Sequence, residues 1–93
     1  MNKVEARSIV GEVLRKYRAK KYLDLKYLID TQDAFEMTGE SGVRYHLEVQ
    51  AVWDSNPNGN LRVMVSIDDL RIHTFFPLTE EFIVSPAGQF IGE

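Results

Sequence analysis

The chain has 93 residues, 44% of them hydrophobic and 11% aromatic, which suits one domain (residues 1–93) with a single core. It has no cysteine, which excludes disulfides, thiolate nucleophiles and cysteine-based zinc or iron–sulfur sites and favours a cytoplasmic location. The net charge of −3 is unevenly divided, because residues 1–27 carry +5 and residues 28–93 carry −8. Such asymmetry is typical of a polyanion-binding segment or of a basic helix over an acidic sheet.

Residues 3–19 are predicted to form a helix. Asn2 and Glu5 have the spacing of an N-cap and its reciprocal partner. The basic residues fall in the last turns, where they complement the helix dipole. Apolar residues recur with helical spacing and form one stripe, made of Val4, Ile9, Val10, Val13, Leu14 and Tyr17. The N-terminus lacks the apolar core of a signal peptide, and no segment approaches the ~18 apolar residues of a membrane span.

The pattern changes after Lys21. Residues 22–29 alternate between apolar and polar types and are predicted to be a strand, although Leu28 breaks the alternation and leaves a second helix as the alternative. Residues 34–38 are a short predicted strand, and "GESG" at 39–42 is a predicted turn. The expected register of this hairpin sets Met37 opposite Val43, Phe35 opposite Tyr45 and Glu36 opposite Arg44.

The strongest pattern is a second hairpin. Residues 43–53 and 61–68 both alternate with period two, and "DSNPNGN" between them reverses the chain. Keeping both apolar sets on one face predicts the pairs Trp53–Leu61, Val49–Val65 and His46–Asp68.

"FIVSPAGQFIGE" near the C-terminus is predicted to be a compact hairpin with a type I turn and Gly88 in a left-handed conformation. In the stretch before it, Leu70, Ile72 and Thr74 alternate with Arg71 and His73, which indicates a short strand or a continuation past a bulge.

This order of elements predicts an α+β fold, with one N-terminal helix packed on a curved antiparallel sheet of four to five strands. The arrangement is similar to that of cystatin-like folds, in architecture only. "QAVWD" at 50–54 resembles the inhibitory loop of cystatins, which would imply protease inhibition. Asp54 stands where that loop has glycine, however, and no matching second loop is present.

The central hairpin places His46, Glu48, Ser66 and Asp68 on one face. As chemistry, this group is compatible with a base oriented by a carboxylate or with a His/Glu/Asp metal site. A catalytic serine needs an oxyanion hole and an exposed elbow, whereas Ser66 is expected in mid-strand. We therefore expect polar pairs on the solvated face of a half-buried sheet, with no catalytic, cofactor-binding or metal-binding residues.

Two alternatives remain open at this stage. A curved sheet leaving a cleft would bind a small molecule or act as an enzyme, with a lining of Tyr45, Trp53, His73 and Phe75. The basic run "RKYRAKKY" interleaves cations with Tyr17 and Tyr22, a composition that suits nucleic acid or another polyanion. Its cations are Arg15, Lys16, Arg18, Lys20 and Lys21. The acidic total and the place of Tyr17 in the apolar stripe make nucleic-acid binding the weaker hypothesis.

The favoured hypothesis is a small non-catalytic binding domain. Val52 and Met64 interrupt the polar face of the central hairpin, and Phe75, Phe76 and Phe82 crowd one stretch, which suggests apolar surface available for contact. The expected partner is a second copy of the chain, or else another protein, such as a basic one that the acidic chain would mask. The expected contact surface is Arg44, His46, Gln50, Val52, Arg62 and Met64.

Overall fold

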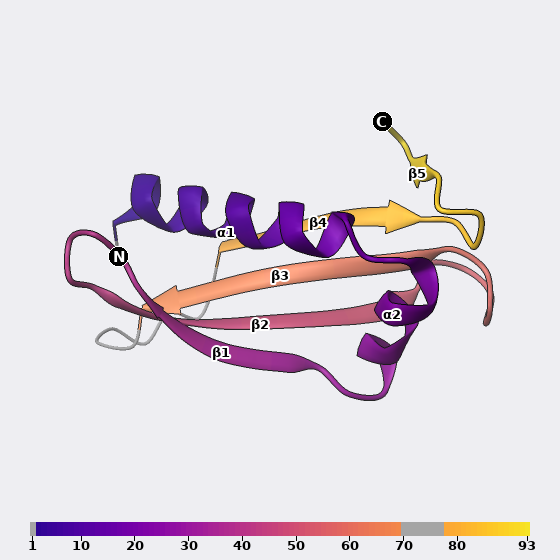
Figure 1. Cartoon of the computed structure of the whole chain (residues 1–93), viewed down its shortest axis with the longest axis horizontal. Helices are drawn as coiled ribbons and strands as arrows, with labels where there is room; N and C mark the ends of the chain where they lie inside the picture. The colour runs from indigo at the N-terminus through magenta and orange to yellow at the C-terminus, as the bar shows by residue number, and fades with distance from the viewer. Residues whose placement is uncertain (1, 70–77) are drawn as a thin grey trace.

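The computed structural model describes residues 2–69 and 78–93, which form two helices, a 3₁₀ turn and one five-stranded antiparallel sheet (Figure 1). The helices are α1 (Lys3–Arg18) and α2 (Tyr22–Lys26), followed by the 3₁₀ turn η1 (Tyr27–Ile29). The strands are β1 (Asp33–Thr38), β2 (Arg44–Trp53), β3 (Leu61–Asp69), β4 (Leu78–Val84) and β5 (Phe90–Ile91), in spatial order β1-β2-β3-β4-β5. The α+β class is confirmed: α1 packs on one face of an antiparallel sheet that does not close into a barrel. Within the described residues, no helix has both the length and the apolar composition needed to cross a membrane.

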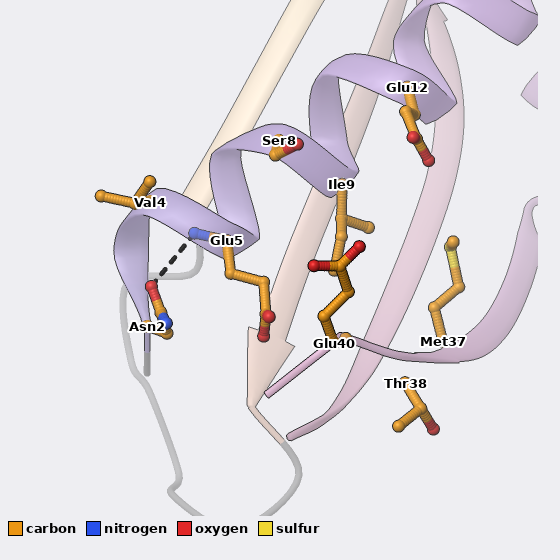
Figure 2. A pocket seen from close by; sticks show the side chains of 10 residues that line it. Asn2, Val4, Glu5, Ser8, Ile9, Glu12, Met37, Thr38 and Glu40 are labelled. Atoms are coloured by element: carbon orange, nitrogen blue, oxygen red, sulfur yellow. Dashed lines mark hydrogen bonds between the residues drawn. The ribbon is translucent and has the colours of Figure 1, made fainter. Parts of the chain in front are cut away.

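Helix α1 begins as predicted, but the partner of Glu5 differs. The Glu5 N–H donates to Asn2 Oδ1 over 3.1 Å, which confirms Asn2 as the N-cap (Figure 2). The Glu5 carboxylate does not accept a hydrogen bond from the Asn2 backbone, as a capping box requires. It accepts hydrogen bonds from the Ser41 N–H (3.0 Å), the Ser41 hydroxyl (2.6 Å) and the Tyr45 hydroxyl (2.9 Å). The predicted contact from the Glu5 carboxylate back to Asn2 is therefore wrong, because Ser41 in the β1–β2 turn and Tyr45 on β2 donate to this carboxylate instead.

The contact between Glu5 and the turn predicts an acid-dependent loss of stability. Hydrogen bonds from Ser41 hold the pKa of the Glu5 carboxyl below its ordinary value of 4.5. Because folding lowers this pKa, the contribution to stability is complete above pH 4.5 and disappears as the pH falls through the folded-state pKa. We expect Glu5→Gln to melt below the wild type at neutral pH and the gap to narrow in acid. Melting curves of both proteins from pH 7 downward measure this gap, and a constant gap would contradict it.

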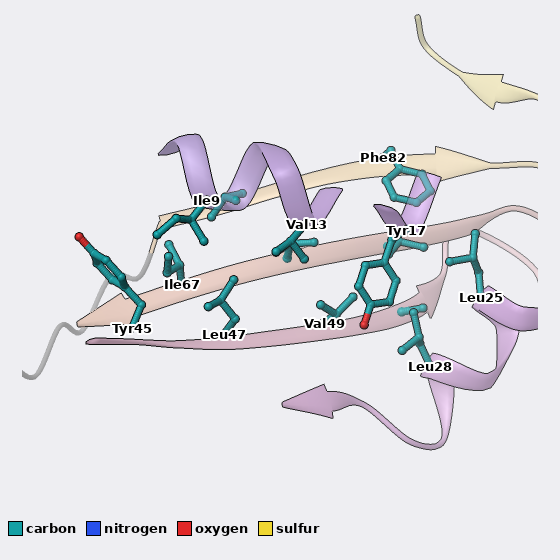
Figure 3. Close-up of a cluster of buried hydrophobic side chains, with 14 of the residues drawn as sticks. Ile9, Val13, Tyr17, Leu25, Leu28, Tyr45, Leu47, Val49, Ile67 and Phe82 are labelled. Carbon is teal, nitrogen blue, oxygen red and sulfur yellow. The ribbon is translucent and has the colours of Figure 1, made fainter. Parts of the chain in front are cut away.

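Residues 22–29 are helical, so the predicted strand is wrong and the alternative is right. Leu25 and Leu28 lie three residues apart on one side of the helical turns and are almost fully buried, whereas Leu23 and Tyr27 are exposed. Leu28, which broke the period-two pattern, was thus the informative residue. Figure 3 shows Leu25 and Leu28 pointing into the core at the end of the sheet.

The central hairpin has the predicted register, with Trp53 opposite Leu61, Val49 opposite Val65 and His46 opposite Asp68. Apart from Val52 and Met64, its apolar residues point to the side that α1 covers, which we call the inner face (Figure 3). Tyr45, Leu47, Val49, Val63, Val65 and Ile67 are fully buried there. Asp69, adjacent to Asp68, also lies on the inner face, at the end of β3.

The register of the first hairpin differs from the prediction by two residues. Met37 lies opposite Tyr45, Phe35 opposite Leu47 and Glu36 opposite His46. A shift of two residues keeps every side chain on its predicted face, so the apolar pattern cannot distinguish the two registers. The turn decides between them: Gly39 N–H donates to the Val43 carbonyl over 2.9 Å, and Gly42 has φ +88°. The expected Glu36–Arg44 ion pair still forms, diagonally, at 2.5 Å.

The C-terminal hairpin forms at the predicted turn. The Gly88 N–H donates to the Ser85 carbonyl over 2.8 Å, and Gly88 has φ +84°. Phe82, which the sequence grouped with exposed aromatics, is instead buried in the core. The strand predicted from Leu70, Ile72 and Thr74 falls outside the described residues, as do His73, Phe75 and Phe76.

Candidate functional site

The face of the sheet opposite α1, here called the outer face, carries all six residues of the predicted contact surface. Each alternates along its strand with buried inner-face residues. On β2, Arg44, Gln50 and Val52 are exposed and His46 is half-buried. On β3, Arg62 and Met64 are half-buried. The structure thus places these residues on one side of the sheet but divides them between two ends with different chemistry.

The polar end contains the histidine–acid group that the sequence singled out. The strand register sets His46 beside Asp68 and Glu48 beside Ser66. His46 Nε2 lies 3.2 Å from Glu48 Oε1, and these side chains are 38% and 42% exposed. With Ile67, the four residues line a depression of about 110 Å³. The group is therefore assembled as predicted and is open to water.

Ser66 lacks the surroundings of a nucleophilic serine, and the described residues form no cluster suited to a metal ion. The Ser66 hydroxyl lies 3.1 Å from the Thr79 hydroxyl, within hydrogen-bond distance, and Ser66 occupies the middle of a regular strand, without the exposed turn of a nucleophile elbow. Across residues 2–69 and 78–93, no three His, Cys, Asp or Glu side chains are arranged to hold a metal ion. The arrangement can accept and donate surface hydrogen bonds, and its charge is acidic.

The opposite end of the outer face is apolar. The register brings Val52, Arg62, Ile83 and Ile91 into one row across four strands, and the next row places Met64 between Gln50 and Glu81. Val52 is 45% exposed and Ile91 is 40% exposed. We call Val52, Met64, Ile83 and Ile91 the apolar end. Sequence reasoning missed Ile83 and Ile91. Each follows a phenylalanine that packs on the inner side, Phe82 or Phe90, so strand alternation would have placed both isoleucines on the outer face.

Arg62 lies within the apolar end but its charge is already paired. One guanidinium nitrogen lies 2.7 Å from Asp54 Oδ1 and the other bonds to Glu81. The hydrogen bond with Asp54, and after it the charge of Glu81, raise the pKa of Arg62. The aliphatic stem of Arg62 is then free to extend the apolar surface.

The lining proposed for a small-molecule cleft is not brought together by the described residues. Tyr45 is fully buried in the core at the start of β2, while Trp53 ends the same strand. Lys26 Nζ lies 5.7 Å from the centre of the Trp53 ring. His73 and Phe75 lie outside the described residues. Tyr45 and Trp53 therefore do not face a common cavity.

A larger depression lies on the other side of the sheet, between α1 and β1 (Figure 2). We call it the α1–β1 groove; its volume is about 530 Å³. Buried Ile9 and half-buried Met37 contribute apolar surface to it, and Glu5, Glu12 and Glu40 contribute carboxylates. Sequence reasoning missed this groove because its residues come from two elements whose packing no local pattern specifies.

The basic run lies at the end of α1 and in the turn after it. Arg15, Lys16, Lys20 and Lys21 are exposed, but Arg18 pairs with Glu93 at 2.5 Å. Tyr17 is buried, and the Tyr22 hydroxyl donates to the Gly59 carbonyl over 2.7 Å. Neither ring is presented for stacking on a base, which weakens the polyanion hypothesis. The charge asymmetry corresponds to a basic helix lying over a sheet with an acidic outer face.

Comparisons of this chain with protein-family models, curated proteins and solved structures found no match. The segment that resembles a cystatin inhibitory loop is strand rather than loop, because Gln50–Trp53 pair with β3. Asp54, at the position of the missing glycine, is held by Arg62.

Proposed function

We propose that this protein is a non-catalytic interaction domain that contacts a second copy of itself, or failing that another protein, through the outer face of the sheet. The observation that supports this is the apolar end, where four apolar side chains from β2, β3, β4 and β5 lie in two neighbouring rows on a face that no described element covers. A domain of 93 residues buries a smaller fraction of its surface in its own core than a large domain does, so burying this apolar surface against a partner would stabilise it.

The charges on the outer face favour one mode of self-contact. Glu36, Glu48 and Asp68 gather at the polar end and would repel the same residues of a second copy. A two-fold axis beside Val52 and Met64 superposes the two apolar ends and directs the polar ends apart. In this arrangement Arg44 and His46 lie at the rim and Gln50, Val52, Arg62 and Met64 lie nearer the centre.

Val52→Glu tests this proposal because it places a carboxylate within the apolar end, beside the proposed two-fold axis. We expect the wild type to sediment as a dimer at tens of micromolar and Val52→Glu to weaken the dimer by at least roughly tenfold. Ala34→Glu, which adds the same charge to the outer face outside the apolar end, is the matched control and should leave the dimer intact. A strictly monomeric wild type would remove the self-contact, and a dimer that tolerates Val52→Glu would remove the apolar end as its interface.

A further inference from the structure

We propose that the open edge of β1, together with the α1–β1 groove, binds an extended basic peptide from a partner protein as an added antiparallel strand. This site is separate from the apolar end and does not depend on the self-contact. Three features carry the inference: the direction of the β1 backbone groups, the lack of protection along this edge, and the shape and charge of the groove beside it.

In the part of the chain that the structure describes, the backbone of β1 presents unpaired groups in a regular pattern. β1 is the outermost strand on its side of the sheet (Figure 1). Because Gly39 N–H donates to Val43, the odd-numbered residues of β1 direct their backbone groups towards β2. Ala34, Glu36 and Thr38 therefore direct their N–H and C=O groups away from the sheet. An incoming strand can pair with all three.

This edge lacks the features that usually prevent strand addition. β1 has no lysine, no proline and no bulge, and its pairing with β2 is continuous over all six residues. Its one inward acidic residue, Asp33, is hydrogen-bonded by the Tyr17 hydroxyl. The other edge of the sheet is better protected, because β5 covers part of β4 and Glu80 places a carboxylate on the inner side, opposite Val65. β1 is thus the edge suited to binding.

The α1–β1 groove lies beside the inner side of this edge. α1 packs mainly over β3 and β4, which leaves Phe35 and Met37 of β1 only half-buried. The groove volume of about 530 Å³ lies within the ~300–1,000 Å³ typical of ligand sites. In strand addition, backbone hydrogen bonds supply affinity, and pockets beside the edge select alternate side chains.

The charge of the groove selects basic side chains. Glu12 and Glu40 are exposed at the groove, and hydrogen bonds from Ser41 favour the anionic form of Glu5. A lysine or arginine can lay its aliphatic stem against Ile9 and Met37 and keep its charge near these carboxylates. Peptide residues opposite Ala34 and Glu36 place their side chains on the outer side of the sheet, and the residues between them point towards the groove. The expected ligand is therefore a strand with a basic residue at every second position.

A synthetic peptide of alternating lysine and threonine, followed by fluorescence anisotropy, tests the proposal. We expect it to bind the wild type, and a peptide of alternating glutamate and threonine not to bind. Ala34→Pro removes a backbone donor that the sheet does not use and should weaken binding roughly tenfold, whereas Ala34→Ser retains the donor and should bind as the wild type. Glu12→Lys should weaken binding several-fold, and Asp24→Lys, which makes the same change in charge on α2, should not.

Peptide N-methylation tests the same geometry without changing the protein, and so covers the case in which Ala34→Pro fails to fold. Methylating the threonine amides, which should face β1, is expected to abolish binding, and methylating the lysine amides is expected to preserve it. Binding that survives threonine methylation, or equal binding of the glutamate peptide, would overturn the proposal. So would a wild type that binds no peptide but forms a dimer that Ala34→Pro dissociates, because a second copy would then occupy the edge.

Discussion

Leu47→Ala is expected to lower the free energy of unfolding by about 3 kcal/mol. Leu47 is fully buried in β2, opposite Ile67 on one side and Phe35 on the other. Figure 3 shows it pointing to the inner face beneath Ile9 and Val13 of α1. Truncation removes buried apolar surface and leaves a cavity between two closely packed layers. The loss is a large fraction of the ~5–15 kcal/mol that stabilises a typical domain.

Urea unfolding measures this loss, and Leu23→Ala is its matched control. Leu23 is 75% exposed on α2, so the same truncation there should change stability by less than about 0.5 kcal/mol. Similar losses for the two variants would contradict a filled core on the inner face, and would restore the hypothesis of a ligand cleft under the sheet.

Phe82→Ala is expected to cost about 3 to 5 kcal/mol, the largest effect of any single substitution considered. Phe82 is only 3% exposed, and its ring meets that of Phe90 edge-on at 5.7 Å between centres. The Arg18 guanidinium lies 5.6 Å from the Phe82 ring and 3.9 Å from that of Phe90. Losing Phe82 therefore removes the aromatic contact between β4, β5 and the end of α1.

Phe90→Ala is the control for this second variant. Phe90 is 36% exposed, so its truncation removes the contact with Arg18 but opens no enclosed cavity, and we expect a loss of about 1 kcal/mol. Thermal unfolding ranks the two variants directly. If Phe90→Ala were the more damaging, Phe90 of β5 rather than Phe82 of β4 would anchor this end of the core.

The two proposed binding surfaces are compatible with one another. The apolar end extends from β2 to β5 on the outer face, whereas peptide addition uses the free edge of β1 and the inner side beside it. A chain that contacts its copy through the first surface would still present the second. Such a protein would display two peptide sites per dimer, and the linkage would increase its avidity for a partner with repeated basic strands.

Local sequence patterns were enough to predict the α1 helix, the central hairpin with its register and the C-terminal turn. Each depends on neighbouring residues: an N-cap at Asn2, period-two alternation on both sides of a turn, and a left-handed Gly88. It also placed the histidine–acid group correctly on the outer face, because alternation fixes the side of a strand on which a residue lies.

The remaining features depend on how the elements pack against one another. The segment with Leu25 and Leu28 is helical because helical spacing lets both side chains enter the end of the core. The first hairpin took a register two residues from the predicted one, in which every side chain still lies on its predicted face. The apolar end and the α1–β1 groove join residues from elements far apart in the chain. Local patterns specify which side of an element is apolar, but the packing of one element against another decides which surfaces stay open. Both proposed sites are surfaces of that kind.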